Sequence, residues 1–148
     1  MSVLVVGSTA LDTVRTPHGE IRDGLGGSAT HFSAAASFFT RVKLVAVVGD
    51  DFPEQHLDFL RSRSVDLAGL RREAGKTFRW SGVYTDDMNE ATTLKTELNV
   101  FETFRPELPE DYRKVRFVFL ANIDPDIQRR VVEQIRDPYV VALDTMNY

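Results

Sequence analysis

The sequence contains no cysteine, which excludes disulfide bonds and thiolate metal sites. It also has no long hydrophobic run: the longest apolar stretches, at 3–6, 44–48 and 117–121, are about a quarter of the length that a membrane-spanning helix needs. No basic segment followed by a signal-like apolar stretch opens the chain. From these absences we expect a cytoplasmic protein without a membrane partner.

Excess positive charge is absent too. Eighteen basic and 22 acidic residues give a net charge of −4, which argues against a general nucleic-acid-binding surface. The three histidines show no paired spacing, so we expect no metal site. What remains is one domain's worth of chain: 148 residues, of which 43% are apolar and 10% aromatic, enough to fill a core.

Short apolar runs and turn residues alternate in the order of an α/β protein. We expect strands at 3–6, 43–48, 66–71, 115–121 and 139–143, and helices at 28–40, 51–63 and 125–136. This order is typical of a three-layer α/β fold with a mostly parallel sheet. The expected helix at 28–40 has Ser28 or Thr30 as a candidate cap.

Two segments depart from that alternation. Residues 12–24 predict a small exposed hairpin, and residues 77–101 predict two strands joined by a turn at 86–89. Two strands alone bury too little surface to be stable, so the second hairpin must pack on something. The last expected strand has no helix after it before Tyr148, and we therefore expect the front part of a longer α/β fold.

Two glycine-containing patterns are candidate ligand sites. Residues 24–29 read G-x-G-x-x-A, a dinucleotide fingerprint with Asp50 as the ribose ligand, although the pattern begins well after the first strand instead of directly behind it. The second pattern joins Asp12, Gly26 and Gly27 to the start of the following helix. There a carboxylate can accept hydrogen bonds from a polyol, and the helix start offers N–H groups. Equally, Asp12 could cap a turn and the glycines could serve only backbone geometry.

Three aromatic or imidazole side chains have two interpretations each. His31 lies one turn into the expected helix, where a lone histidine is more often a packed, hydrogen-bonded residue than a catalyst. Trp80 and Tyr84 alternate along the second hairpin and could stack on a flat ligand. They could also form the packing face that the hairpin needs, and we favour packing.

The order of these parts resembles the N-terminal half of the ribokinase/PfkB family of sugar and nucleoside kinases. The residues that carry the resemblance are Val5-Val6-Gly7-Ser8 with Asp12, the run Leu25-Gly26-Gly27-Ser28-Ala29-Thr30-His31 with its alanine-rich continuation to Ala36, the segment Val47-Val48-Gly49-Asp50-Asp51-Phe52, residues 77–101, and Leu143-Asp144. The resemblance runs through residues 1–148 but covers only about half of a family member. It implies a ribokinase-like fold with a small β lid, formed by residues 12–24 and 77–101, that commonly pairs two subunits into a homodimer.

The resemblance also implies the substrate site. In the family, the residues matching Asp12, Gly26 and Gly27 hold sugar hydroxyls. The position of His31, usually an asparagine, touches substrate, and Asn122 lies near a further contact. Asp144 and Asn147 resemble an Asp-x-Asn motif with one extra residue.

The family uses ATP and Mg²⁺, and its catalytic aspartate lies in a Gly-Ala-Gly-Asp segment that this sequence lacks. We therefore expect no catalytic residue in this chain and no turnover by the chain alone. The sequence predicts the substrate-binding half of an ATP-dependent sugar kinase, which in the complete enzyme phosphorylates a hydroxyl of a sugar or nucleoside. The alternatives are a non-catalytic sugar-binding or dimerisation module and, less favoured, a dinucleotide-binding domain.

Overall fold

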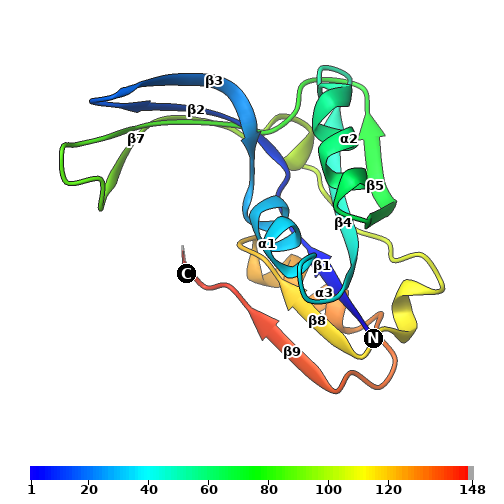
Figure 1. Ribbon diagram of the computed structural model, residues 1–148. Helices are drawn as coiled ribbons and strands as arrows, with labels where there is room; N and C mark the ends of the chain where they lie inside the picture. Colours follow the sequence, from blue (N-terminus) through cyan, green and yellow to red (C-terminus); the bar gives the residue numbers. More distant parts are fainter. Residues whose placement is uncertain (147–148) are drawn as a thin grey trace.

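The computed structural model describes residues 1–146 and contains two sheets (Figure 1). The first sheet has five strands in the order β5-β4-β1-β8-β9, and each neighbouring pair is parallel. Its strands are β1 (Ser2–Val6), β4 (Arg41–Gly49), β5 (Val65–Glu73), β8 (Phe117–Leu120) and β9 (Val140–Leu143). This is the mostly parallel α/β sheet that the sequence predicts.

Helices cover the two faces of this sheet. The helices α1 (Ser28–Ala36) and α2 (Glu54–Ser62) lie on one face, and α3 (Pro125–Val132) lies on the other (Figure 1). Alternate side chains of the central strands therefore enter different cores: Leu4 and Val6 pack with Val131 of α3, whereas Val5 packs with Ala29 and Leu60 of the other two helices. Burial on both faces explains why the central strands read as continuous apolar runs. The expected three-layer arrangement is confirmed.

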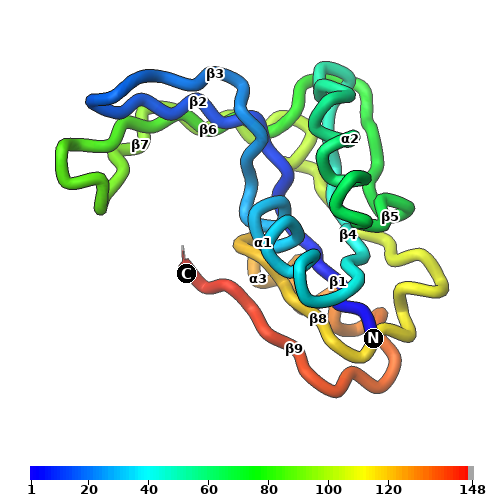
Figure 2. Tube along the Cα trace, viewed as in Figure 1, coloured from blue at the N-terminus to red at the C-terminus, as the bar shows by residue number. Residues whose placement is uncertain are grey.

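The second sheet is a four-stranded layer that we call the lid, with the strand order β3-β2-β6-β7. Its strands are β2 (Ala10–Thr16), β3 (Gly19–Gly26), β6 (Arg79–Tyr84) and β7 (Ala91–Glu97). The hairpin β6–β7 does not stand alone, because β6 pairs in parallel with β2 of the other hairpin. The lid projects from the core as a single layer (Figure 2).

The helix boundaries differ from the sequence-based expectation. The first helix ends at Ala36 instead of residue 40, and after it the backbone N–H groups of Phe38 and Phe39 bond three residues back, to Ala35 and Ala36, in a tighter turn. The second begins at Glu54 instead of 51, since Pro53 is extended and disfavours a helical residue before it. The third ends at Val132 instead of 136.

The end of the second hairpin also differs. The strand β7 stops at Glu97, and a short 3-10 turn, η1 (Asn99–Phe101), replaces the last predicted strand residues. Asn99 has a positive φ of 52° and donates its side-chain amide to the Thr77 carbonyl at 2.9 Å. A second 3-10 turn, η2 (Tyr112–Lys114), leads into β8.

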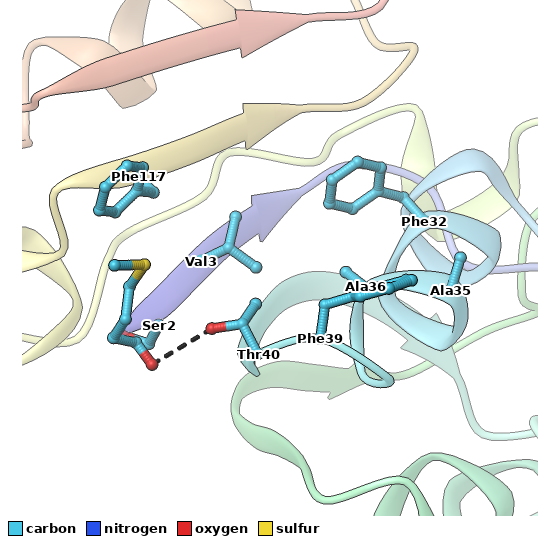
Figure 3. Close-up of a pocket in the computed structure, with 9 residues that line it drawn as sticks. Ser2, Val3, Phe32, Ala35, Ala36, Phe39, Thr40 and Phe117 are labelled. Atoms are coloured by element: carbon cyan, nitrogen blue, oxygen red, sulfur yellow. Dashed lines mark hydrogen bonds between the residues drawn. The ribbon is translucent and has the colours of Figure 1, made fainter.

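An apolar pocket of about 450 Å³ lies beside the start of β1 (Figure 3). Phe32, Ala36 and Phe39 of the α1 region face Val3 and Phe117 across it, and Thr40 donates its hydroxyl to the Met1 carbonyl at 3.2 Å. The pocket is separate from the residues that the sequence marks as a site. Among the described helices, none is long and apolar enough to cross a membrane.

Candidate functional site

A cleft of about 1070 Å³ lies between the lid and the core sheet. Ser8 and Asn122, which follow β1 and β8, both line it. The chain leaves these two neighbouring strands in opposite directions, since β1 leads to β4 on one side and β8 leads to β9 on the other. The carboxyl ends of strands at such a switch point are where open α/β sheets bind ligands.

Asp12 lines this cleft from the lid strand β2. Its Oδ1 atom is enclosed, and within the described structure it has no hydrogen-bond partner. Burial raises the pKa of this carboxyl above its ordinary value of 3.8, while the charge of His31 and the Gly27 N–H act in the opposite direction. An enclosed carboxylate oxygen without a donor is costly for folding, and this is the state that a ligand hydroxyl would relieve.

Gly26 and Gly27 each lie where a side chain would clash, but with different neighbours. A side chain at Gly26 would place its Cβ within 2.0 Å of Asp12 Oδ2, so Gly26 makes room for the carboxylate. Gly27 has a φ of 96°, and a Cβ there would lie 2.4 Å from the Ser8 carbonyl oxygen. Of the two, only Gly27 lines the cleft. Close packing therefore accounts for both glycines: Gly26 leaves space for the Asp12 carboxylate, and Gly27 fits against the backbone of Ser8.

The start of α1 corrects one expectation. Neither Ser28 nor Thr30 caps the helix, because Gly27 occupies the cap position and has no side chain to do so. Ser8 replaces the cap from the end of β1: its hydroxyl accepts the Ser28 N–H at 3.0 Å and its carbonyl accepts the Ala29 N–H at 3.1 Å. These N–H groups are therefore already bonded and not open to a ligand.

His31 and Asn122 complete the predicted set. His31 is exposed at the first turn of α1 and Asn122 is half-buried behind β8, and both line the cleft. The structure thus gathers Asp12, Gly27, His31 and Asn122 around one cavity, with Gly26 directly beneath the Asp12 carboxylate.

Trp80 packs on the lid, as favoured from the sequence, and its side of the cleft is also open to a ligand. It packs against the lid, since a Cβ at Gly82 would lie 2.3 Å from its ring, and it also lines the cleft. Its indole N–H donates to Thr93 Oγ1 at 3.1 Å. Tyr84, further along the same strand, lines the cleft as well. Packing and access to a ligand are therefore not exclusive at this position.

A polar cluster joins the lid to the core; we call it the hinge cluster, formed by Asp51, Thr77, Arg79 and Asp23. Thr77, which is fully buried, donates its backbone N–H and its hydroxyl to Asp51 Oδ1 at 2.7 Å each. Arg79 at the start of β6 donates to Asp51 Oδ2 at 2.8 Å and pairs with Asp23 of β3. Partial burial raises the pKa of Asp51, but hydrogen bonds from Arg79 and Thr77 outweigh it and hold that pKa below 3.8.

The dinucleotide alternative does not fit this geometry. Gly24 and Gly26 both lie in the lid strand β3 and not in the turn after β1. Asp50, the proposed ribose ligand, accepts the Gly75 N–H at 3.2 Å and is not among the residues that line the cleft.

The resemblance implies ATP and Mg²⁺ with their main binding residues outside this chain, and two features of the described residues bear on these groups. Between residues 1 and 146, no three His, Asp or Glu side chains gather closely enough to hold a metal ion. The N-terminus of α1 has its Ser28 and Ala29 N–H groups bonded to Ser8, so these groups cannot receive a phosphate.

Other cleft residues are not apparent from the sequence. Phe78 and Phe101, at the two ends of the second hairpin segment, stack with their ring centroids 5.2 Å apart. Arg105 and Arg130 also line the cleft. Only Asp124 has a local signal, because it precedes Pro125 and caps α3 by accepting the Asp126 N–H. The others meet only through the tertiary fold.

The predicted Asp144–Asn147 motif is described in part. Asp144 follows β9, donates its N–H to the Leu120 carbonyl at 2.9 Å and accepts the Met146 N–H at 2.9 Å. Asn147 lies outside the described residues. The bond to Leu120 extends the pairing of β9 with β8, and the bond from Met146 closes a local turn.

Comparison with known proteins places this fold in a known class. No protein-family model matches the chain. A cytidine kinase of Thermococcus kodakarensis is 25% identical over 144 residues, which are 96% of this chain and 51% of that protein. The nucleoside kinase of Methanocaldococcus jannaschii, an archaeal member of the ribokinase family, superposes with a TM-score of 0.73 at 18% identity over 99% of this chain and 52% of its own.

A ribokinase of Cryptococcus neoformans in complex with ADP has a TM-score of 0.78 at 17% identity over 98% of this chain and 51% of its own. The fold is that of ribokinase-family sugar and nucleoside kinases. The chain spans about half the length of the proteins it matches.

Proposed function

We propose that this chain is the substrate-binding half of an ATP-dependent kinase that phosphorylates a hydroxyl of a sugar or nucleoside. The observation that carries the proposal is the enclosed, unpartnered Oδ1 atom of Asp12 in a cleft at the switch point of the sheet. The names of the similar proteins, a cytidine kinase, a nucleoside kinase and a ribokinase, support the same substrate classes.

The roles proposed for the cleft follow from its chemistry. Asp12 accepts hydrogen bonds from substrate hydroxyls, each worth roughly 1.5–3 kcal/mol because the acceptor is charged. His31 and Asn122 stand on the core side of the same cavity and can donate or accept further bonds. The group that deprotonates the acceptor hydroxyl and most of the ATP site are assigned to a second half that this sequence does not contain, so the chain alone binds without turnover.

A binding measurement with paired variants tests this assignment. Isothermal titration of the chain with ribose, hexoses and ribonucleosides should show binding of at least one of them, and Asp12→Asn should abolish it. Asp86→Asn, an equivalent change at an exposed residue of the β6–β7 turn, should bind as the unaltered chain does. Absence of binding by every ligand, or equal binding by Asp12→Asn, would reject the proposal.

A second measurement separates a kinase half from a non-catalytic binding module. Both bind without turnover, but only the first requires a second half with a Gly-Ala-Gly-Asp-like segment. Sequencing the gene beyond the codon for Tyr148, and its neighbourhood, shows whether such a segment is encoded. If it is present, phosphoryl transfer should appear when both halves are supplied together with ATP and Mg²⁺.

The lid also carries the proposed homodimer contact. Ile21 on β3 and Leu94 on β7, the two edge strands of the lid, are 56% and 58% exposed. Pairing of two lids would cover them.

A further inference from the structure

The strand register of the lid places an indole ring beside the proposed sugar-binding carboxylate. Asp12 of β2 is the direct partner of Trp80 of β6, and Trp80 in turn faces Thr96 of β7. Direct partners on neighbouring strands project to the same face and stand about 5 Å apart. Asp12 and Trp80 therefore enter the cleft from adjacent strands, and both line it.

The indole extends away from Asp12 along the lid. Its six-membered ring covers Gly82, two residues further along β6, as shown by the ring atoms that a Cβ at Gly82 would meet at 2.3–3.1 Å. Two residues of a strand correspond to about 7 Å. A group that stacks on this ring is therefore a neighbour of the group held by Asp12 and not the same ring.

The indole is also fixed before any ligand arrives. The absence of a side chain at Gly82 lets the ring rest on the backbone, and the N–H bond to Thr93 sets its rotation. Preorganised aromatic surfaces bind flat ligands with little loss of side-chain entropy. Tyr84 and Asn89 line the cleft beyond it, so the cavity continues past the indole toward the lid turn.

We infer that the substrate is a nucleoside, with its ribose hydroxyls on Asp12 and its planar base stacked on Trp80. This inference rests on the proposed function and names its substrate class. A free sugar would occupy only the Asp12 end of a cleft of about 1070 Å³. A nucleoside instead joins a polyol to a flat ring, and Asp12 and the neighbouring Trp80 ring over Gly82 offer one partner for each. Thr96 and Asn89 offer polar groups for the edge of the base.

The test compares ribonucleosides with free ribose and hexoses by isothermal titration. In the unaltered chain, at least one ribonucleoside should bind more tightly than any free sugar. Trp80→Ala should weaken that nucleoside about 5- to 150-fold, the range expected for loss of one base–aromatic stack. Trp80→Ala should change free-sugar binding less than twofold, and Trp80→Phe should restore part of the nucleoside affinity.

Phe39→Ala provides a matched control. Phe39 is 90% exposed at the end of the α1 region and does not line the cleft, so its loss should leave all affinities unchanged. If free ribose or a hexose binds as tightly as every nucleoside, or loses as much affinity in Trp80→Ala, the inference is overturned while the sugar-kinase proposal stands. If no sugar or nucleoside binds, both fail.

Discussion

Removing the Asp51 carboxylate should detach the lid from the core. In Asp51→Ala, the buried Thr77 loses the acceptor of both its backbone N–H and its hydroxyl, while Arg79 keeps only Asp23. A buried donor left without a partner costs about 1–3 kcal/mol. We expect a loss of about 2–5 kcal/mol in the free energy of unfolding from these donors together. For a chain of this size, that corresponds to a melting temperature lower by about 5–20 °C.

The conservative variant separates hydrogen bonding from charge. The amide oxygen of Asp51→Asn can still accept from Thr77, but the charged contact with Arg79 is lost, so the destabilisation should be smaller than in Asp51→Ala. The pKa of Asp51 is lower in the folded chain than its ordinary 3.8, which means that its contribution is present above pH 3.8 and disappears as the pH falls through the folded value. The gap between the unaltered chain and Asp51→Asn should therefore close on acidification below about pH 4.

Calorimetry or circular dichroism across this pH range measures both effects. Asp58→Ala is the control, because Asp58 is exposed on α2 and its pair with Arg61 should contribute less than about 1 kcal/mol. Hydrogen exchange of the β6 amides gives a local readout of lid attachment. Equal melting temperatures for Asp51→Ala and Asp58→Ala would refute the assignment of the hinge cluster.

Three further outcomes are expected. Gly26→Ala should lower the free energy of unfolding in urea by about 1–3 kcal/mol and weaken ligand binding, because the new Cβ would lie 2.0–2.6 Å from the Asp12 carboxylate. Gly24→Ala is the control and should have neither effect, because its nearest contact is the flexible Ile21 side chain at 3.1 Å. Asp12→Asn should have a higher melting temperature than the unaltered chain at neutral pH, because the raised pKa of Asp12 means that its charged form destabilises the fold. This difference in melting temperature should shrink as the pH falls through that pKa. A lower melting temperature for Asp12→Asn would indicate a structural role. The homodimer proposal predicts a dimer in sedimentation velocity that Leu94→Lys converts to a monomer, and a monomeric unaltered chain at high micromolar concentration would contradict it.

The sequence predicts the core sheet well because its signal is local. Runs such as 3–6 and 44–48 are buried on both faces, and a continuous apolar run is what such burial selects. Helix ends are predicted less well, because the residues that end or cap a helix come from elsewhere. Ser8 caps α1 although the first lid hairpin separates it from Ser28 in the sequence, and no pattern near Ser28 predicts this contact.

The candidate site also has a part that the sequence predicts locally and a part that depends on distant residues. Asp12 and the glycine pair can be predicted because Asp12 comes shortly after the first apolar run and the glycines come directly before a helix. The pairing of Asp12 with Trp80 depends on the parallel register between β2 and β6, which belong to two different hairpins. Only the assembled sheet shows that these two side chains stand next to each other, and the same holds for the contact of Asp51 with Arg79.

The packing of the Trp80 ring on Gly82, at the wall of the cleft, has a practical consequence. The sequence contains a single tryptophan, so the whole indole fluorescence of the protein originates at the wall of the cleft. Emission intensity and wavelength therefore report on this one site without an attached dye. Quenching by acrylamide or iodide would show at once whether a bound molecule shields the ring from solvent.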